Sequence, residues 1–161
     1  MYKKDILKTR LLYLAGGLAI GICVALIIFF VYTLQLRTEY RKTALEINEC
    51  VLAYQEKDST VTWKGKTYPL SEACLDYYNR FLLDAKTVVA GRRSMEPTER
   101  SIILSFGGGK LTFTQAHEDG YSTNIRWETP DGVKNYEVAS QTTFMQMAAY
   151  ISNYTRRLEQ E

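Results

Sequence analysis

The sequence has little cysteine, proline or histidine: its 161 residues include three cysteines, three prolines and one histidine. Three cysteines are too few for a disulfide-dense scaffold, and three prolines with ten glycines exclude a collagen-like repeat. A hydrophobic content of 46% is too high for a disordered tail. The composition therefore indicates a folded protein with a single imidazole available for chemistry.

Charge is absent from residues 11–36, and residues 11–32 are apolar throughout. A helix of that length spans about 33 Å, which is enough to cross the hydrocarbon core of a bilayer. The run is longer than the apolar region of a signal peptide, and no small-residue cleavage site follows it. We therefore expect residues 11–34 to form one uncleaved transmembrane signal anchor.

The basic residues around this run indicate its orientation. The tail of residues 1–10 has a net charge of +3, and three basic residues, Arg37, Arg41 and Lys42, follow the run. The short basic tail favours a cytoplasmic N-terminus, which places the later residues outside the cell membrane. The rest of the chain has a net charge of −1, which argues against a nucleic-acid partner.

Small residues recur every fourth position inside the predicted span, at Gly17, Gly21 and Ala25. This spacing lets two helix backbones approach closely, so the stripe indicates packing against another membrane protein or a second copy. The alternative is that the stripe has no function, because glycine is common in membrane spans and this spacing often arises by chance.

Residues 35–57 are expected to form a membrane-proximal amphipathic helix. Its apolar residues are spaced four and three apart, at Tyr40, Ala44, Ile47, Val51 and Tyr54. This heptad spacing is typical of a dimeric stalk or partner face. The alternative, which we favour, is a helix that covers its own domain's core, because Leu45 and Leu52 widen the stripe.

Residues 58–161 have the pattern of an extracytoplasmic α+β domain. Residues 60–70 form a predicted hairpin around Lys64-Gly65, and Ser71 caps a predicted helix over residues 72–86. Residues 87–100 are expected to be irregular.

Four β-type runs follow between residues 101 and 139, with short turn-rich connections, and Ser140 is expected to cap a last helix. The fold class predicted is α+β: the transmembrane helix, then an antiparallel sheet of a four-strand meander plus a short hairpin, packed with about three helices.

Candidate chemical sites are weak. His117 lies beside Glu118 and Asp119 in a predicted turn, where neighbouring side chains diverge, so a solvated hairpin tip is expected rather than a metal site. The glycines at 107–109 precede Lys110, but a strand follows rather than the helix that a phosphate loop requires. We therefore expect no cofactor, no metal and no enzymatic activity.

Cys50 and Cys74 lie on the two predicted helices that flank the hairpin. In an oxidising compartment a disulfide between them would contribute about 3 kcal/mol by the loop-entropy model. Otherwise the two are expected to be small core residues.

These features favour a single-pass membrane-anchored accessory or scaffold subunit whose outer domain mediates protein–protein interaction or assembly. The alternative is an extracytoplasmic ligand-binding or sensor module that signals through a membrane partner. That alternative predicts an apolar pocket with a few convergent polar groups between the helices and the sheet.

Overall fold

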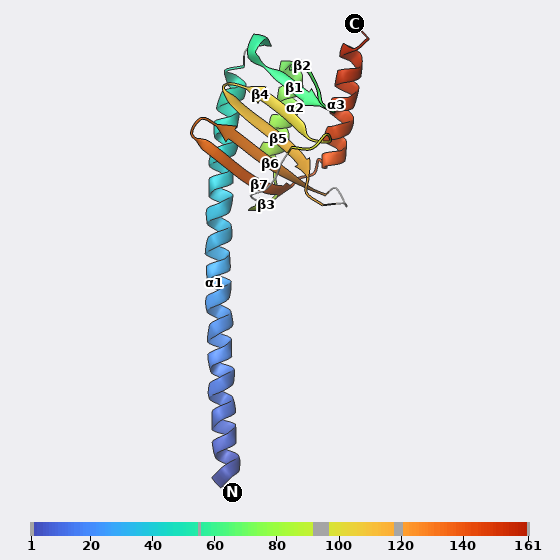
Figure 1. The fold of residues 1–161 in the computed structure, drawn as a ribbon. Helices are drawn as coiled ribbons and strands as arrows, with labels where there is room; N and C mark the ends of the chain where they lie inside the picture. Colours follow the sequence, from blue (N-terminus) through green and yellow to red (C-terminus); the bar gives the residue numbers. More distant parts are fainter. Residues whose placement is uncertain (1, 55, 92–96, 118–120, 161) are drawn as a thin grey trace. The chain divides into compact units, whose positions relative to one another are not determined.

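The computed structural model describes residues 2–54, 56–91, 97–117 and 121–160, and the chain divides into two compact units, residues 1–35 and 36–161 (Figure 1). Helix α1 (Tyr2–Leu52) begins in the first unit and ends in the second. The side chains of residues 10–32 are all exposed. Near the N-terminus the structure thus has one helix that is long and apolar enough to cross a membrane.

The second unit is built on one antiparallel sheet of seven strands in the order β2-β1-β4-β5-β6-β7-β3 (Figure 1). The strands are β1 (Thr60–Trp63), β2 (Lys66–Pro69), β3 (Thr87–Ala90), β4 (Ile102–Phe106), β5 (Gly109–Gln115), β6 (Ser122–Thr129) and β7 (Gly132–Ala139). Strands β4 to β7 form the predicted meander, and strand β1 joins the predicted hairpin to it by pairing with β4.

Two α-helices besides α1 lie within the described residues. Helix α2 (Glu72–Leu83) is capped by Ser71, whose side chain accepts a hydrogen bond from the Cys74 amide. Helix α3 (Phe144–Leu158) begins with a capping box, in which Thr143 and Gln146 each bond the other's backbone amide. A short 3-10 helix, η1 (Glu56–Asp58), precedes the sheet.

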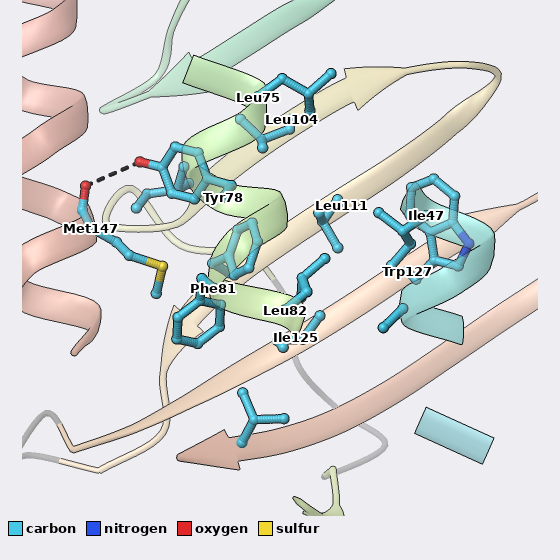
Figure 2. Close-up of a cluster of buried hydrophobic side chains, with 14 of the residues drawn as sticks. Ile47, Leu75, Tyr78, Phe81, Leu82, Leu104, Leu111, Ile125, Trp127 and Met147 are labelled. Carbon is cyan, nitrogen blue, oxygen red and sulfur yellow. Dashed lines mark hydrogen bonds between the residues drawn. The ribbon is translucent and has the colours of Figure 1, made fainter. Parts of the chain in front are cut away.

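One face of the sheet carries the core. In strand β4 buried and half-buried residues alternate, and the same alternation places Leu104, Leu111 and Trp127 side by side across neighbouring strands. These side chains pack with residues of all three helices, including Ile47, Leu75 and Met147. Figure 2 shows this cluster, with Tyr78 of α2 donating a hydrogen bond of 3.0 Å to the Met147 carbonyl of α3.

The predicted α+β class is confirmed, but the number of strands differs from the prediction. Residues 87–100 were expected to be irregular, whereas Thr87–Ala90 form strand β3, which pairs with β7 at one edge of the sheet. A run of four residues is too short to show a periodicity, and its partner lies about 50 residues later in the sequence.

Helix boundaries also need correction. The first helix ends at Leu52 rather than near residue 57, and the second ends at Leu83 rather than at Lys86. The cap of the last helix is Thr143 rather than Ser140, because only Thr143 is followed three residues later by a glutamine that completes a capping box.

Candidate functional site

The predicted packing stripe of the span lies on the surface of α1. Gly17, Gly21 and Ala25 are all exposed. A Cβ atom added at either glycine would meet no heavy atom within 4 Å. Within the described residues the stripe therefore has open space in front of it.

The stripe at residues 40–54 belongs to the core of the second unit. Tyr40, Ala44 and Ile47 are buried, and Val51 and Tyr54 are half-buried against the same cluster. The Tyr40 hydroxyl donates to the Leu82 carbonyl at 2.8 Å, and burial raises the pKa of Tyr40 above its ordinary value. The structure thus places this stripe against the core of the second unit, which is the arrangement that the core-covering alternative describes.

The two cysteines of the second unit are free thiols. Cys74 is fully buried, and this burial raises the pKa of its thiol to about 12. Cys50 is half-buried, and its pKa is raised first by burial and then by the nearby carboxylates Glu46 and Glu49. Raised pKa values make both thiols poor nucleophiles at neutral pH.

His117 is exposed, and its Nε2 atom lies 3.0 Å from Glu137 Oε1. Its sequence neighbours Glu118 and Asp119 lie outside the described residues. Among the residues that the structure does describe, no group of three potential metal ligands is found.

The glycine run forms a hairpin turn between β4 and β5. Phe106 pairs with Gly109 across a two-residue loop, and both loop residues, Gly107 and Gly108, have positive φ angles of 54° and 76°. This combination is the type I′ turn that joins antiparallel strands tightly. A loop of this shape offers no helix N-terminus for a phosphate.

A polar groove lies between the β1–β2 hairpin and helix α3, and no sequence motif indicated it. The hairpin groove, as we call it, has a volume of about 280 Å³. It is lined by Trp63, Lys64, Lys66 and Tyr68 of the hairpin and by Ser152, Thr155, Arg156 and Glu159 at the end of α3.

Buried hydrogen bonding fixes the floor of the hairpin groove. Trp63 is only 6% exposed, and its indole Nε1 donates to Ser152 Oγ at 3.2 Å. Thr155 is 5% exposed, and its hydroxyl donates to the Ser152 carbonyl. The Trp63 bond joins strand β1 to helix α3, and the Thr155 bond lies within α3. The Trp63 bond therefore holds the two walls of the groove together.

The rim of the groove holds a carboxylate of the chain itself. Glu159 Oε1 accepts hydrogen bonds from Lys66 Nζ at 2.9 Å and from the Tyr68 hydroxyl at 2.7 Å. The hydrogen bond from Lys66 is the main cause of the lowered pKa of Glu159. The same carboxylate raises the pKa values of Lys66 and Tyr68.

The groove has more positive than negative charge. Lys64, Lys66 and Arg156 line it, against the single carboxylate of Glu159. Sequence analysis missed this site because its two halves are about 90 residues apart and neither half has a distinctive motif. The only local signal was a pair of lysines flanking Gly65 in the hairpin.

Comparison of the chain with protein-family models, with curated proteins and with solved structures gave no match.

Proposed function

We propose that this chain is a single-pass membrane-anchored accessory or scaffold subunit whose second unit lies outside the cytoplasm and holds a protein partner or further copies of the chain. One observation carries the proposal: an apolar helical segment whose side chains are all exposed among the residues that the structure describes. The side chains of residues 11–32 are all exposed. A contiguous apolar surface of this size in water is unfavourable, and a bilayer covers it.

The small-residue stripe supports association inside the membrane. Lipid tails are as apolar as leucine, so two spans associate through close backbone packing rather than through the hydrophobic effect. Gly17 and Gly21 lie one turn apart on α1 with free space before them, which is the surface that such packing requires. The partner is a second copy or another membrane protein.

The experiment is purification of the tagged full-length chain from its native membranes in mild detergent, with the stoichiometry of the complex measured by mass spectrometry. We expect a stoichiometric partner or a homo-oligomer, which is lost when Gly17 and Gly21 are both replaced by isoleucine. Gly16→Ile is the control for added bulk, because it places one isoleucine beside Gly17 but off the stripe. A wild-type chain that is only monomeric contradicts the proposal.

Orientation is tested separately by labelling single cysteines with a membrane-impermeant thiol reagent in intact cells. Cys23, Cys50 and Cys74 are first replaced by serine or alanine, and one cysteine is then introduced in place of exposed Glu99 or exposed Lys8. We expect labelling at residue 99 and none at residue 8. The reverse pattern would place the second unit in the cytoplasm.

The hairpin groove favours the second candidate function, an extracytoplasmic ligand-binding or sensor module. The sequence predicted an apolar pocket with a few convergent polar groups for such a module. The groove is polar instead, but it gathers four charged side chains between the β1–β2 hairpin and α3. In this case the ligand binds at the groove and the span contacts the signalling partner.

A further inference from the structure

The rim of the hairpin groove is built around a carboxylate that the chain supplies to itself. Glu159 is the C-cap residue of α3, and its Oε1 atom receives both the Lys66 ammonium and the Tyr68 phenol from strand β2. An ammonium and a hydroxyl that converge on one oxygen form a site suited to a carboxylate.

We propose that the hairpin groove binds a ligand that carries carboxylate groups, and that Glu159 occupies the same position as a tethered competitor. The ligand's carboxylate takes the place of Glu159 at Lys66 and Tyr68. The proposal rests on the groove alone, so it stands or fails independently of the membrane association proposed above.

The contact that Glu159 makes is easily displaced. The Lys66 and Glu159 side chains are 70% and 48% exposed, so water screens their ion pair, and exposed pairs of this kind stabilise a fold only slightly. The site can therefore exchange an internal carboxylate for an external one without disturbing the core. Trp63 and Thr155, which fix the floor of the groove, are buried and take no part in this exchange.

Two further cations line the groove and make no ion pair with the described residues. Lys64 lies with its ammonium 5.7 Å from the centroid of the Trp63 ring, and exposed Arg156 projects from the last turn of α3. When a ligand carboxylate takes the place of Glu159 at Lys66, the groove still contains three cations, Lys64, Lys66 and Arg156. The chain supplies only one carboxylate, Glu159, to balance them. A ligand with two carboxylates, one at Lys66 and one near Arg156, matches this charge distribution.

The dimensions of the groove limit the ligand. A volume of about 280 Å³ is at the lower end of the range for small-molecule pockets, so the groove accepts a small organic acid or two acidic side chains of a peptide. The shared chemistry is the carboxylate, and the experiment distinguishes the two sources.

The test uses the full-length chain in nanodiscs of zwitterionic phosphatidylcholine, labelled with 5-fluorotryptophan. The chain has two tryptophans, Trp63 in the groove and Trp127 in the core, so the fluorine spectrum contains a reporter and an internal reference. The spectrum of Trp63→Phe assigns the two resonances. Glutarate, an acetylated and amidated tetraglutamate peptide, and inorganic phosphate are titrated in turn at constant ionic strength.

We expect the Trp63 resonance to shift and saturate with glutarate or with the peptide, while the Trp127 resonance stays in place. The carboxylate compound that saturates at the lower concentration identifies the source. Lys66→Gln should weaken binding by about tenfold or more, because it removes the cation that faces the carboxylate. Glu159→Gln should strengthen binding by about threefold to fivefold, because it removes the competing charge.

Lys110→Gln is the matched control for loss of one positive charge. Lys110 is a lysine on strand β5 that lies 3.9 Å from a glutamate and does not line the groove. Three results would overturn the proposal: no saturable shift of Trp63 with either carboxylate, equal saturation by phosphate, or equal weakening by Lys110→Gln and Lys66→Gln. Unchanged or weaker binding by Glu159→Gln would overturn the assignment of Glu159 as a competitor.

Discussion

Replacing Ile47 by alanine tests whether the end of α1 belongs to the core of the second unit. Ile47 is 1% exposed and lies beside Trp127 in the buried cluster, as Figure 2 shows. The substitution removes three buried carbon atoms, Cγ1, Cγ2 and Cδ1. At about 0.8 kcal/mol per buried methylene, the lost burial amounts to about 2.5 kcal/mol.

The remaining cavity adds to this cost. The residues around Ile47 come from a helix and from the sheet, and they can close the space only in part. Large-to-small substitutions of buried isoleucine cost about 2–5 kcal/mol in total, so we expect Ile47→Ala to lower the free energy of unfolding by about 3–4 kcal/mol. Leu45→Ala is the matched control, because Leu45 lies on the same helix and is 53% exposed. Its expected cost is below about 0.5 kcal/mol.

The assay is urea unfolding of the full-length chain in a neutral detergent, followed by tryptophan fluorescence. Both tryptophans lie in the second unit, so the signal reports this unit rather than the apolar segment. The oligomeric state of each variant is measured in parallel. Equal stability of Ile47→Ala and Leu45→Ala, with loss of an oligomer in Ile47→Ala alone, would refute the core assignment and favour a dimeric stalk.

Three further predictions use the same unfolding assay. Gly109→Ala should destabilise the fold by about 1–3 kcal/mol, because its Cβ would lie 2.1 Å from Cη2 of Trp127 and the ring must move; unchanged stability would show that the ring has room. Thr123→Val should raise stability by about 1 kcal/mol, because the buried hydroxyl has no hydrogen-bond partner among the described residues and the replacement keeps its shape; a loss of stability would reveal a partner for that hydroxyl. Glu46→Gln should destabilise at pH 6 and have less effect below pH 4.5, because hydrogen bonds from Lys134 and then from Trp127 lower the pKa of Glu46 below its ordinary value of 4.5. Stability from such a lowered carboxyl pKa is present above the ordinary value and is lost as the pH falls through the folded value, so a pH-independent difference would refute this assignment.

The parts of the fold that local residues determine could be predicted from the sequence. The turn at Gly107-Gly108 needs two positive φ angles, which glycine adopts without strain, so its place between two apolar strands was sufficient to predict a hairpin. Phe144, Met147 and Ile151 of α3 likewise lie on one helical face and are buried, as their spacing predicts. Strand β3 was missed because four residues carry no period of their own, and only its pairing with β7 makes them a strand.

The hairpin groove could not be predicted, for a related reason. Its carboxylate cluster joins Lys66 and Tyr68 to Glu159 across 93 and 91 positions of sequence. Lys66 and Glu159 are exposed and Tyr68 is half-buried, and none of the three has a distinctive sequence context. The cluster exists only because the Trp63 bond to Ser152 and the buried face of α3 bring the hairpin and the helix end together. A site of this kind depends on tertiary packing and has no signature in residue spacing.

The stripe at residues 40–54 packs on the core through other residues than those on which the prediction was based. The core-covering alternative was favoured because Leu45 and Leu52 appeared to widen the apolar face, yet these side chains are 53% and 80% exposed. The face is widened instead by Thr43, which is 3% exposed and lies 3.0 Å, hydroxyl to hydroxyl, from Tyr136 on strand β7. A threonine satisfies its hydroxyl against the sheet and buries its methyl group, so it serves as a core residue that hydropathy does not reveal. Leu45 and Leu52 are then left as exposed apolar side chains on the outer side of the same helix, and a spacing of four and three alone does not distinguish the two sides.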